Sequence, residues 1–210
     1  MFYERIVKRG IDFLLALIGL VVAVVPMMIV AVAIKAESKG PVIFKQDRLG
    51  YKGKVYKMYK FRSMCVGAEN KGSGVYSDKN DARVTKVGKF IRATSIDELP
   101  QLINVLKGDM ALVGFRSPLT YHPWPWEEYT EEQKKMFDVR PGITGWAQVN
   151  GRKTVEWHRR IELNVWYAEN VSFMLDLKIL FLTIFKVLVN ADNENIGETV
   201  VKSTDQKAGK

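Results

Sequence analysis

The sequence predicts an α+β fold in which an N-terminal re-entrant membrane helix precedes a small domain of helices with a short β-hairpin and interfacial amphipathic helices. Three features predict it: an uncharged apolar run over 13–34, two strand-like segments joined by a glycine turn, and a helical repeat of leucines after Ser95. We divide the chain into a membrane-anchoring helix (1–39), a domain that carries the interfacial helices (40–190) and a polar C-terminal tail (191–210).

The composition excludes several classes of protein. A formal net charge of +9 over 210 residues favours an anionic partner, either lipid headgroups, a nucleotide or nucleic acid. The single cysteine, Cys65, excludes an intrachain disulfide framework, and with only two histidines a structural zinc site is not expected. The sequence contains no glycine-rich phosphate loop of the P-loop or dinucleotide type.

The apolar run over 13–34 is long enough for a membrane segment, because a helix of this length measures about 33 Å. Pro26 lies past its middle and is expected to break or kink the helix. Basic residues flank the run on both sides, so the positive-inside rule gives no orientation. We therefore predict a re-entrant helix that enters and leaves by one face, in preference to a single span.

Two further segments are candidates for contact with lipid. The apolar stretch 173–189 is interrupted by charges such as Asp176, which suits a helix lying in the membrane interface. Tyr121, Trp124 and Trp126 form an aromatic loop of a kind found at headgroup depth, and an ordinary buried loop explains it equally well.

Segments 42–44 and 55–61 are predicted to be two strands joined through a glycine turn. On the second strand the two-residue period puts Lys60 and Arg62 on the same face. Such a pair of cations is as often a solvated surface as a ligand site. An anionic ligand becomes the better explanation if other cations converge on it, and Arg83 is one further candidate.

Adjacent acids, Asp97 and Glu98, fall in the first turn of a predicted amphipathic helix. Ser95 is expected to be its N-cap, with Glu98 as the reciprocal partner of a capping box. Acids at a helix start stabilise the helix itself, so this pattern alone indicates only a cap. Arg92 and Arg116 on either side favour a ligand site, because guanidinium groups suit bidentate contacts to phosphate oxygens. A diphosphate approaches paired carboxylates once cations, a divalent metal among them, neutralise the charge.

Residues 141–152 form a glycine-punctuated loop rich in side-chain donors, including Gln148, Asn150 and Arg152. A helix is predicted to follow, and Asn164 falls on its otherwise apolar stripe. A buried amide needs hydrogen-bond partners, and the sequence leaves open whether Asn164 is a satisfied core amide or a ligand contact.

Five segments together resemble the bacterial sugar transferases that act as monotopic phosphoglycosyl transferases. They are S-K-G-P-V-I-F-K-Q at 38–46, Y-K-F-R-S-M at 59–64, T-S-I-D-E-L-P-Q-L-I-N-V-L-K-G-D-M at 94–110, R-P-G-I-T-G-W-A-Q-V-N-G-R at 140–152, and F-M-L-D-L-K-I-L at 173–180. Their joint order and spacing, together with the apolar segment and its proline, make the match highly specific. The chain resembles the minimal form of this family, in which no multi-span extension precedes the apolar segment.

The resemblance implies transfer of a sugar-1-phosphate from a UDP-sugar to polyprenyl (undecaprenyl) phosphate, with release of UMP. This reaction initiates the synthesis of glycoconjugates and polysaccharides. The resemblance further implies Mg²⁺ as cofactor and a monotopic location at the cytoplasmic leaflet of the bacterial inner membrane, where downstream glycosyltransferases take up the product. Nucleic acid is not among the expected partners.

The same resemblance implies roles for individual residues. Asp97 is the expected nucleophile, which forms an aspartyl phospho-sugar intermediate, and Glu98 is expected to handle Mg²⁺ or a proton. Both acids are therefore candidate metal ligands. Arg92 and Arg116 match positions expected to hold phosphate groups. The other substrate-binding candidates are Lys60 and Arg62, which match the family's basic strand, and Arg83, Gln148, Asn150, Arg152 and Asn164.

Two departures from the family pattern bear on activity. Where the family usually reads V-G-P-R-P, Phe115 replaces a proline and Ser117 stands as an insertion, which affects the local backbone and the selectivity for nucleotide or sugar. Asn164 stands where the family commonly has an acid, and an amide keeps the size but loses the charge. We predict that activity survives both changes.

The main alternative is a catalytically silent membrane adaptor that keeps the fold but has lost activity through these departures. A basic nucleic-acid-binding protein would leave the apolar segment without a purpose. A plain phosphohydrolase would release the sugar phosphate to water, whereas the preferred function places it on lipid.

Overall fold

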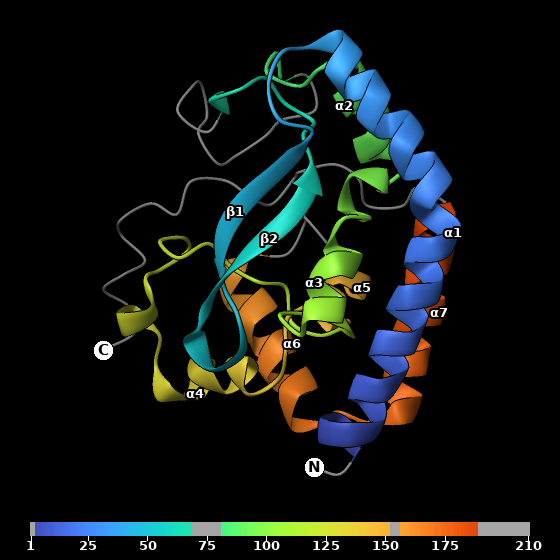
Figure 1. Cartoon of the computed structure of the whole chain (residues 1–210). Helices are drawn as coiled ribbons and strands as arrows, with labels where there is room; N and C mark the ends of the chain where they lie inside the picture. Colours follow the sequence, from blue (N-terminus) through green and yellow to red (C-terminus); the bar gives the residue numbers. More distant parts are fainter. Residues whose placement is uncertain (1–2, 69–80, 152–155, 189–210) are drawn as a thin grey trace.

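The computed structural model describes residues 3–68, 81–151 and 156–188, and it has the mixed helical and small-sheet architecture that the sequence predicts (Figure 1). The β1–β2 hairpin lies in the middle of the view, with α3 beside it and with α1 and α7 along one side. The predicted tail over 191–210 lies outside the described residues. In chain order the helices and strands are α1 (Lys8–Glu37), β1 (Ile43–Leu49), β2 (Val55–Phe61), α2 (Lys86–Ala93), α3 (Gln101–Lys107), β3 (Ala111–Val113), α4 (Glu131–Lys134), β4 (Gly142–Thr144), α5 (Trp146–Val149), α6 (Trp157–Glu169) and α7 (Phe173–Leu188).

Helix α1 runs through Pro26 without interruption, so the predicted break does not occur, and Figure 1 shows the helix curving along the molecule. It is long and apolar enough to cross a membrane, and only 11% of its most apolar window is buried. Most of the remaining surface exposes apolar side chains such as Val22 and Ile29. One stripe of α1 therefore packs on the protein while the rest is suited to an apolar environment. The buried stripe consists of Lys8, Asp12, Ala16, Ala23, Val30 and Ile34.

A buried network of charged and phenolic groups joins the start of α1 to α7. Nζ of Lys8 lies 2.8 Å from Oδ2 of Asp176 and 3.6 Å from Oδ2 of Asp12. The hydroxyls of Tyr3 and Tyr167 donate to the two carboxylate oxygens of Asp176, at 2.7 and 2.6 Å. We call these five residues the α1–α7 junction. Because Lys8 lies beside both carboxylates and the two phenols donate to Asp176, the junction connects two apolar helices with each buried ion next to an opposite charge.

Strands β1 and β2 form the predicted antiparallel hairpin, with β1 longer than the sequence indicated. Their register pairs Gln46 with Met58 and Arg48 with Tyr56. Directly paired residues lie on the same face of a hairpin, and the two-residue period adds Lys60 to that face. The candidate site is built on this face.

The short strands β3 and β4 pair in parallel, which the sequence did not predict. Two glycines allow the contact, because the strands approach more closely than side chains would permit. A Cβ on Gly114 would lie 2.1 Å from the carbonyl oxygen of Arg140, and a Cβ on Gly142 would lie 2.1 Å from the nitrogen of Gly114.

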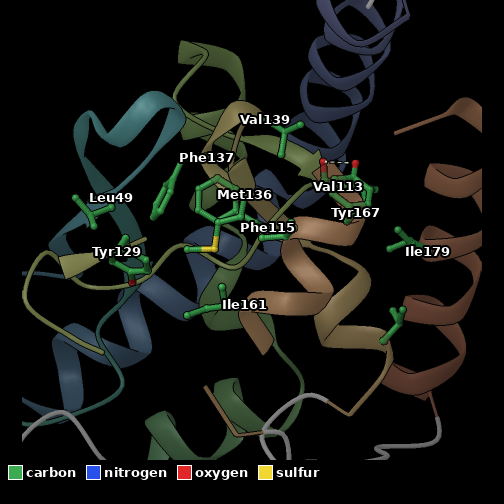
Figure 2. Packing of buried hydrophobic residues seen from close by; sticks show 12 residues of the cluster. Leu49, Val113, Phe115, Tyr129, Met136, Phe137, Val139, Ile161, Tyr167 and Ile179 are labelled. Carbon is green, nitrogen blue, oxygen red and sulfur yellow. Dashed lines mark hydrogen bonds between the residues drawn. The ribbon is translucent and has the colours of Figure 1, made fainter. Parts of the chain in front are cut away.

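The main hydrophobic core surrounds Phe115, one of the residues that depart from the family pattern (Figure 2). Phe115 is fully buried and packs edge-to-face against Phe137, with ring centroids 5.0 Å apart. Trp124 and Trp126 pack against the same core, whereas Tyr121 is 61% exposed. The two tryptophans of the aromatic loop are therefore partly buried against the core, and Phe115 anchors the segment that follows β3.

Candidate functional site

The acid pair lies in a 3₁₀ turn of its own, Ile96–Glu98, and not in the first turn of a longer helix. Ser95 has φ 57° and ψ 15°, which is the left-handed conformation, and its side chain forms no capping hydrogen bond. The predicted capping box is therefore wrong: α3 begins at Gln101, and the carboxylate of Glu98 bonds to Lys60 instead. A non-glycine residue in this conformation costs about 1–2 kcal/mol, so the backbone directly ahead of the acid pair is strained.

Asn104 of α3 holds this turn against the hairpin. Its side chain is completely buried, accepts a hydrogen bond from the backbone nitrogen of Tyr59 at 3.0 Å, and donates to the carbonyl of Lys57 at 2.8 Å. The amide thus provides hydrogen-bond partners for the backbone N–H and C=O groups at the edge of β2, as a neighbouring strand would. This contact fixes the distance between the acid turn and Lys60, the next residue of β2.

Lys60 brings a positive charge to the acid pair. Its Nζ lies 2.6 Å from Oε1 of Glu98, and both side chains are partly buried. Burial raises the pKa of Asp97 above its ordinary value, the charge of Lys60 opposes the rise, Glu98 adds to it and Arg92 opposes it. The desolvation of Asp97 therefore outweighs the attraction of the cations around it.

Arg92 approaches the acid pair from α2. A Cβ on Gly88 would lie 1.9 Å from the carbonyl oxygen of Ser63, so glycine is needed for α2 to rest on the segment after β2. Nε of Arg92 then donates to Oγ of Ser63 at 2.8 Å. Burial lowers the pKa of Arg92, and the negative charge of Asp97 opposes that fall.

A cleft beside the acid turn gathers charged side chains from distant parts of the sequence, and we call it the polar cleft. Its volume is about 20 Å³, so a phosphate group can enter only if the flexible cationic side chains move. Within the described part of the chain no hydrogen bond or ion pair engages the guanidinium of Arg116. The polar and charged residues that line the cleft are Arg48, Lys60, Glu98, Gln101, Arg116 and Ser117.

Arg48 and Gln101 line the cleft although the sequence did not indicate them, and Ser117, which also lines it, was noted only as a departure from the family pattern. Arg48 shares its strand face with Gln46 by the two-residue period, and this alternation is the signal that would have identified it. Gln101 is 3% exposed and is the first residue of α3, three positions after Glu98.

A larger groove of about 300 Å³ lies between α4 and α6. Its lining includes Glu132, Glu162 and Glu169, which would repel an anionic ligand. The polar cleft is the better candidate site because its lining contains the cations.

Two arginines that the sequence proposes for substrate binding are engaged elsewhere. The guanidinium of Arg62 donates to the backbone carbonyls of Ser38 and Lys39 at 2.8 and 2.7 Å, and so caps the end of α1. Arg83 is buried and forms an ion pair with Asp81, donating also to the carbonyl of Ala68 at 2.7 Å. Neither residue lines the polar cleft.

The candidates after β4 also lie away from the cleft lining. Asn150 is exposed and donates to the carbonyl of Trp146 at 2.8 Å, whereas both amide atoms of Gln148 are buried without a hydrogen-bond partner in the described structure. Asn164 is 2% exposed on α6, and its Oδ1 is likewise buried and unpartnered. Arg152 lies outside the described residues.

The donor set at the acid turn bears on the expected magnesium ion. Among the described residues no group of three or more His, Cys, Asp or Glu side chains could hold a metal. Asp97 and Glu98 offer two carboxylates, and one Glu98 oxygen is engaged by Lys60. They fit Mg²⁺ in its usual mode, in which one or two carboxylates bind and substrate phosphates and water complete the coordination.

Comparison with known proteins shows which proteins the chain resembles. The family model described as "Bacterial sugar transferase" matches residues 3–190. The chain is 47% identical over 185 residues to the "Uncharacterized sugar transferase EpsL" of Bacillus subtilis (strain 168), covering 88% of this chain and 89% of that protein.

Named transferases are also similar. The chain is 44% identical over 192 residues to the "UDP-glucose:undecaprenyl-phosphate glucose-1-phosphate transferase" of Escherichia coli (strain K12), covering 89% of this chain and 41% of that protein. It is 42% identical over 185 residues to the "UDP-N-acetylgalactosamine-undecaprenyl-phosphate N-acetylgalactosaminephosphotransferase" of Aeromonas hydrophila, covering 87% of this chain and 44% of that protein. The chain thus spans less than half the length of these two relatives. The match over almost its whole length shows that it belongs to the bacterial sugar transferase family.

Proposed function

We propose that this chain is a phosphoglycosyl transferase, which transfers a sugar-1-phosphate from a UDP-sugar to a polyprenyl phosphate such as undecaprenyl phosphate and releases UMP. The reaction initiates the synthesis of a glycoconjugate or polysaccharide, and downstream glycosyltransferases extend the product. Support comes from the relatives, whose names describe sugar-phosphate transfer to undecaprenyl phosphate.

The observation that carries the proposal is a cleft whose lining includes Glu98 and Arg116, with Asp97 next to Glu98 in the acid turn and outside the lining itself. The carboxyl group of Asp97 is desolvated, and the positive charges of Lys60 and Arg92 act on it. The guanidinium of Arg116 has no hydrogen-bond or ion-pair partner in the described structure. An arginine in this state is suited to a phosphate group, because two of the phosphate oxygens can each accept one of two parallel hydrogen bonds from the guanidinium.

The proposed chemistry has two steps. In the first, an oxygen of the Asp97 carboxylate attacks the sugar-linked phosphorus, and the bond from that phosphorus to the oxygen of UMP breaks. In the second, an oxygen of the polyprenyl phosphate attacks the same phosphorus, and the bond to Asp97 breaks and restores the carboxylate. Covalent catalysis of this kind lets two anionic substrates react at one site in turn.

Asp97 and Glu98 would hold the Mg²⁺ ion, which when bound neutralises charge on the phosphates. Glu98 keeps its ion pair with Lys60 at 2.6 Å and so orients the lysine toward the cleft. Arg116 and Arg92 would bind phosphate oxygens and hold the donor in place for attack.

We further propose that the chain lies on the cytoplasmic face of the inner membrane, with α1 as a re-entrant anchor and α7 in the interface. The exposed apolar residues of α7, together with the exposed face of α1, support this placement. The proposal keeps the predicted division of the chain at 39 and 190. Epitopes at both chain ends should be accessible from the cytoplasm, and finding them on opposite sides would exclude the re-entrant anchor. The exposed apolar residues of α7 are Phe173, Met174, Phe181, Ile184, Phe185 and Val187.

The function is tested with purified protein in detergent, Mg²⁺, polyprenyl phosphate and a panel of UDP-sugars labelled in the sugar. The expected result is UMP release with the label recovered on lipid for at least one donor. Label recovered as free sugar phosphate would indicate a phosphohydrolase, and no release from any donor would contradict the proposal.

A catalytically silent adaptor is the second candidate, and Asn164 is the residue that favours it. If Asn164→Asp restores UMP release to a protein that otherwise releases none, the chain is a silent member of the family. Since Asn164 lies outside the polar cleft lining and its Oδ1 is buried without a hydrogen-bond partner in the described structure, we expect wild-type activity and no gain from the aspartate.

A further inference from the structure

Arg48 is the second arginine of the polar cleft, and its contacts show how firmly it is held. Its Nε and Nη2 both donate to Oε1 of Gln46, at 3.1 and 2.7 Å, and its Nη1 donates to the carbonyl of Ser117 at 2.9 Å. A guanidinium has five N–H donors. These contacts therefore leave N–H groups on both terminal nitrogens for a ligand.

One carboxylate, Glu98, lines the same cleft, and its charge acts on Arg48 without forming an ion pair with it. Across the described ranges neither Arg48 nor Arg116 forms an ion pair, although both line the same cleft. Burial and the charge of Arg116 lower the pKa of Arg48 to about 10, so Arg48 keeps its charge at neutral pH while the two guanidinium groups repel each other. Two like charges left facing one cleft are stabilised when an anion binds between them.

The loop that departs from the family pattern is what positions Arg48. The hydroxyl of Ser117 donates to the carbonyl of Leu49 at 2.6 Å, and the nitrogen of Leu49 donates to the carbonyl of Pro118 at 3.1 Å. The loop therefore runs beside β1 like a third strand, and its Ser117 carbonyl lies within reach of the guanidinium. Phe115, which directly precedes Arg116 in the chain, is buried in the core and holds the backbone on that side of Arg116.

We propose that Arg48 and Arg116 form a two-arginine clamp for the diphosphate of the donor, with Gln46 and Ser117 as positioning residues for Arg48. This inference rests on the proposed function and adds to it a substrate-binding residue outside the sequence candidates. Two guanidinium groups match the charge of a diphosphate that must come close to the carboxylates of Asp97 and Glu98. Ser117, which departs from the family pattern, thereby contributes to donor binding by holding Arg48 in place.

The clamp is tested by binding in an Asp97→Asn background, so that turnover does not interfere. The probes are UMP, inorganic pyrophosphate and uridine, measured by calorimetry in detergent. Arg48→Gln should weaken UMP and pyrophosphate about 10- to 100-fold, as expected for loss of charged hydrogen bonds, and should leave uridine binding unchanged. Gln46→Ala should cost less, about threefold, because the guanidinium is freed and not removed. Lys45→Gln, at an exposed position of β1, is the matched control and should change nothing.

A purely structural role for Arg48 would give a different result. Arg48→Gln would then lower the thermal midpoint while UMP and pyrophosphate bind at parental affinity, and this outcome overturns the clamp. If Arg48→Gln does not fold, Arg48→Lys is the variant to measure, because lysine keeps the charge but cannot form the bidentate hydrogen bonds of a guanidinium. A reduced affinity of this variant for pyrophosphate supports the clamp, and an unchanged affinity overturns it. Absence of pyrophosphate binding in the parent also overturns it.

Failure of the proposed function would look different. If pyrophosphate binds in an Arg48-dependent way while the wild-type protein releases no UMP from any donor, the clamp stands and the transfer reaction is excluded.

Discussion

The α1–α7 junction and the polar cleft contain the same kinds of charged group, but the junction pairs its cation with carboxylates whereas the cleft leaves one cation, Arg116, without a partner in the described structure. At the junction, Lys8 lies 2.8 Å from Asp176, and both oxygens of that carboxylate accept a phenolic hydrogen. In the cleft, Lys60 pairs with Glu98 at 2.6 Å, but Arg116 has no hydrogen-bond or ion-pair partner in the described part of the chain. The state of pairing separates charges that hold the fold from charges that await a ligand.

The arginines alone also divide into those that are engaged in structural contacts and those that are available to a ligand. Arg62 caps the carbonyls at the end of α1, and Arg83 pairs with Asp81, so both belong to the fold. Arg116 makes neither kind of contact within the described ranges. Residue type alone does not separate these roles, because the surrounding backbone decides which arginine is engaged.

The largest expected effect is at the junction. Lys8→Met removes the cation that lies between Asp12 and Asp176 and leaves two buried carboxylates uncompensated. We expect a loss of about 3–5 kcal/mol in the free energy of unfolding, measured as a fall in thermal midpoint in detergent. Lys57→Met is the matched control, because its ion pair with Asp47 is exposed and should be worth little. Equal effects of the two variants would contradict the assigned role of the junction.

Arg116→Gln should have the next largest effect, on catalysis and not on stability. We expect turnover to fall about 100-fold, or about 2.7 kcal/mol of transition-state stabilisation, with an unchanged thermal midpoint because Arg116 makes no hydrogen bond or ion pair in the described structure. Arg62→Gln should show the reverse, a lower midpoint with folded enzyme still active. The comparison fails if Arg116→Gln mainly destabilises the protein.

Asn104→Ala tests the contact that positions the acid turn. The change leaves the Tyr59 nitrogen and the Lys57 carbonyl without their buried partner, so we expect a loss of about 2 kcal/mol in stability. Turnover of the folded variant should also fall, because Lys60 and Glu98 lose their fixed separation. A stable variant with normal turnover would show that Asn104 does not position the site.

The smallest expected effect is a gain in stability from Asp97→Asn. A carboxyl whose folded pKa is raised contributes stability that is present below its unfolded pKa and is lost as the pH rises through the folded value. In metal-free protein the variant should therefore melt a few degrees higher than wild type near pH 8, and the difference should vanish near pH 3.5. Asp47→Asn, at an exposed ion pair, should show no such gain. A destabilised Asp97→Asn would mean that the carboxylate is satisfied in the fold.

The local sequence pattern was sufficient to predict the β1–β2 hairpin and the buried face of α6. The hairpin followed from its turn and alternation, and the predicted stripe on α6 is present, with Ile161 and Asn164 buried at 3% and 2% exposure. The pairing of β3 with β4 was not predictable, because three-residue strands carry no periodic signal and depend on the glycine contact at Gly114.

The candidate site was only partly predictable, because its distinguishing features are contacts between distant segments. The sequence gives Glu98 a partner three residues away, whereas the fold supplies Lys60 from β2 and leaves Ser95 in a left-handed conformation. Arg48 shows the same limitation, since its partner Ser117 is 69 residues away in the chain.

The central claim is that Asp97 carries the phospho-sugar. The direct test is intact mass spectrometry after the protein is mixed with Mg²⁺ and a UDP-sugar that supports turnover, with no polyprenyl phosphate present. We predict that the intact mass increases by one sugar phosphate and that a digest of the same sample places this adduct on the peptide that contains Asp97. The adduct should be lost when polyprenyl phosphate is added and should be absent in Asp97→Asn. Turnover by Asp97→Asn at the wild-type rate, or an adduct on a different residue, would contradict the claim.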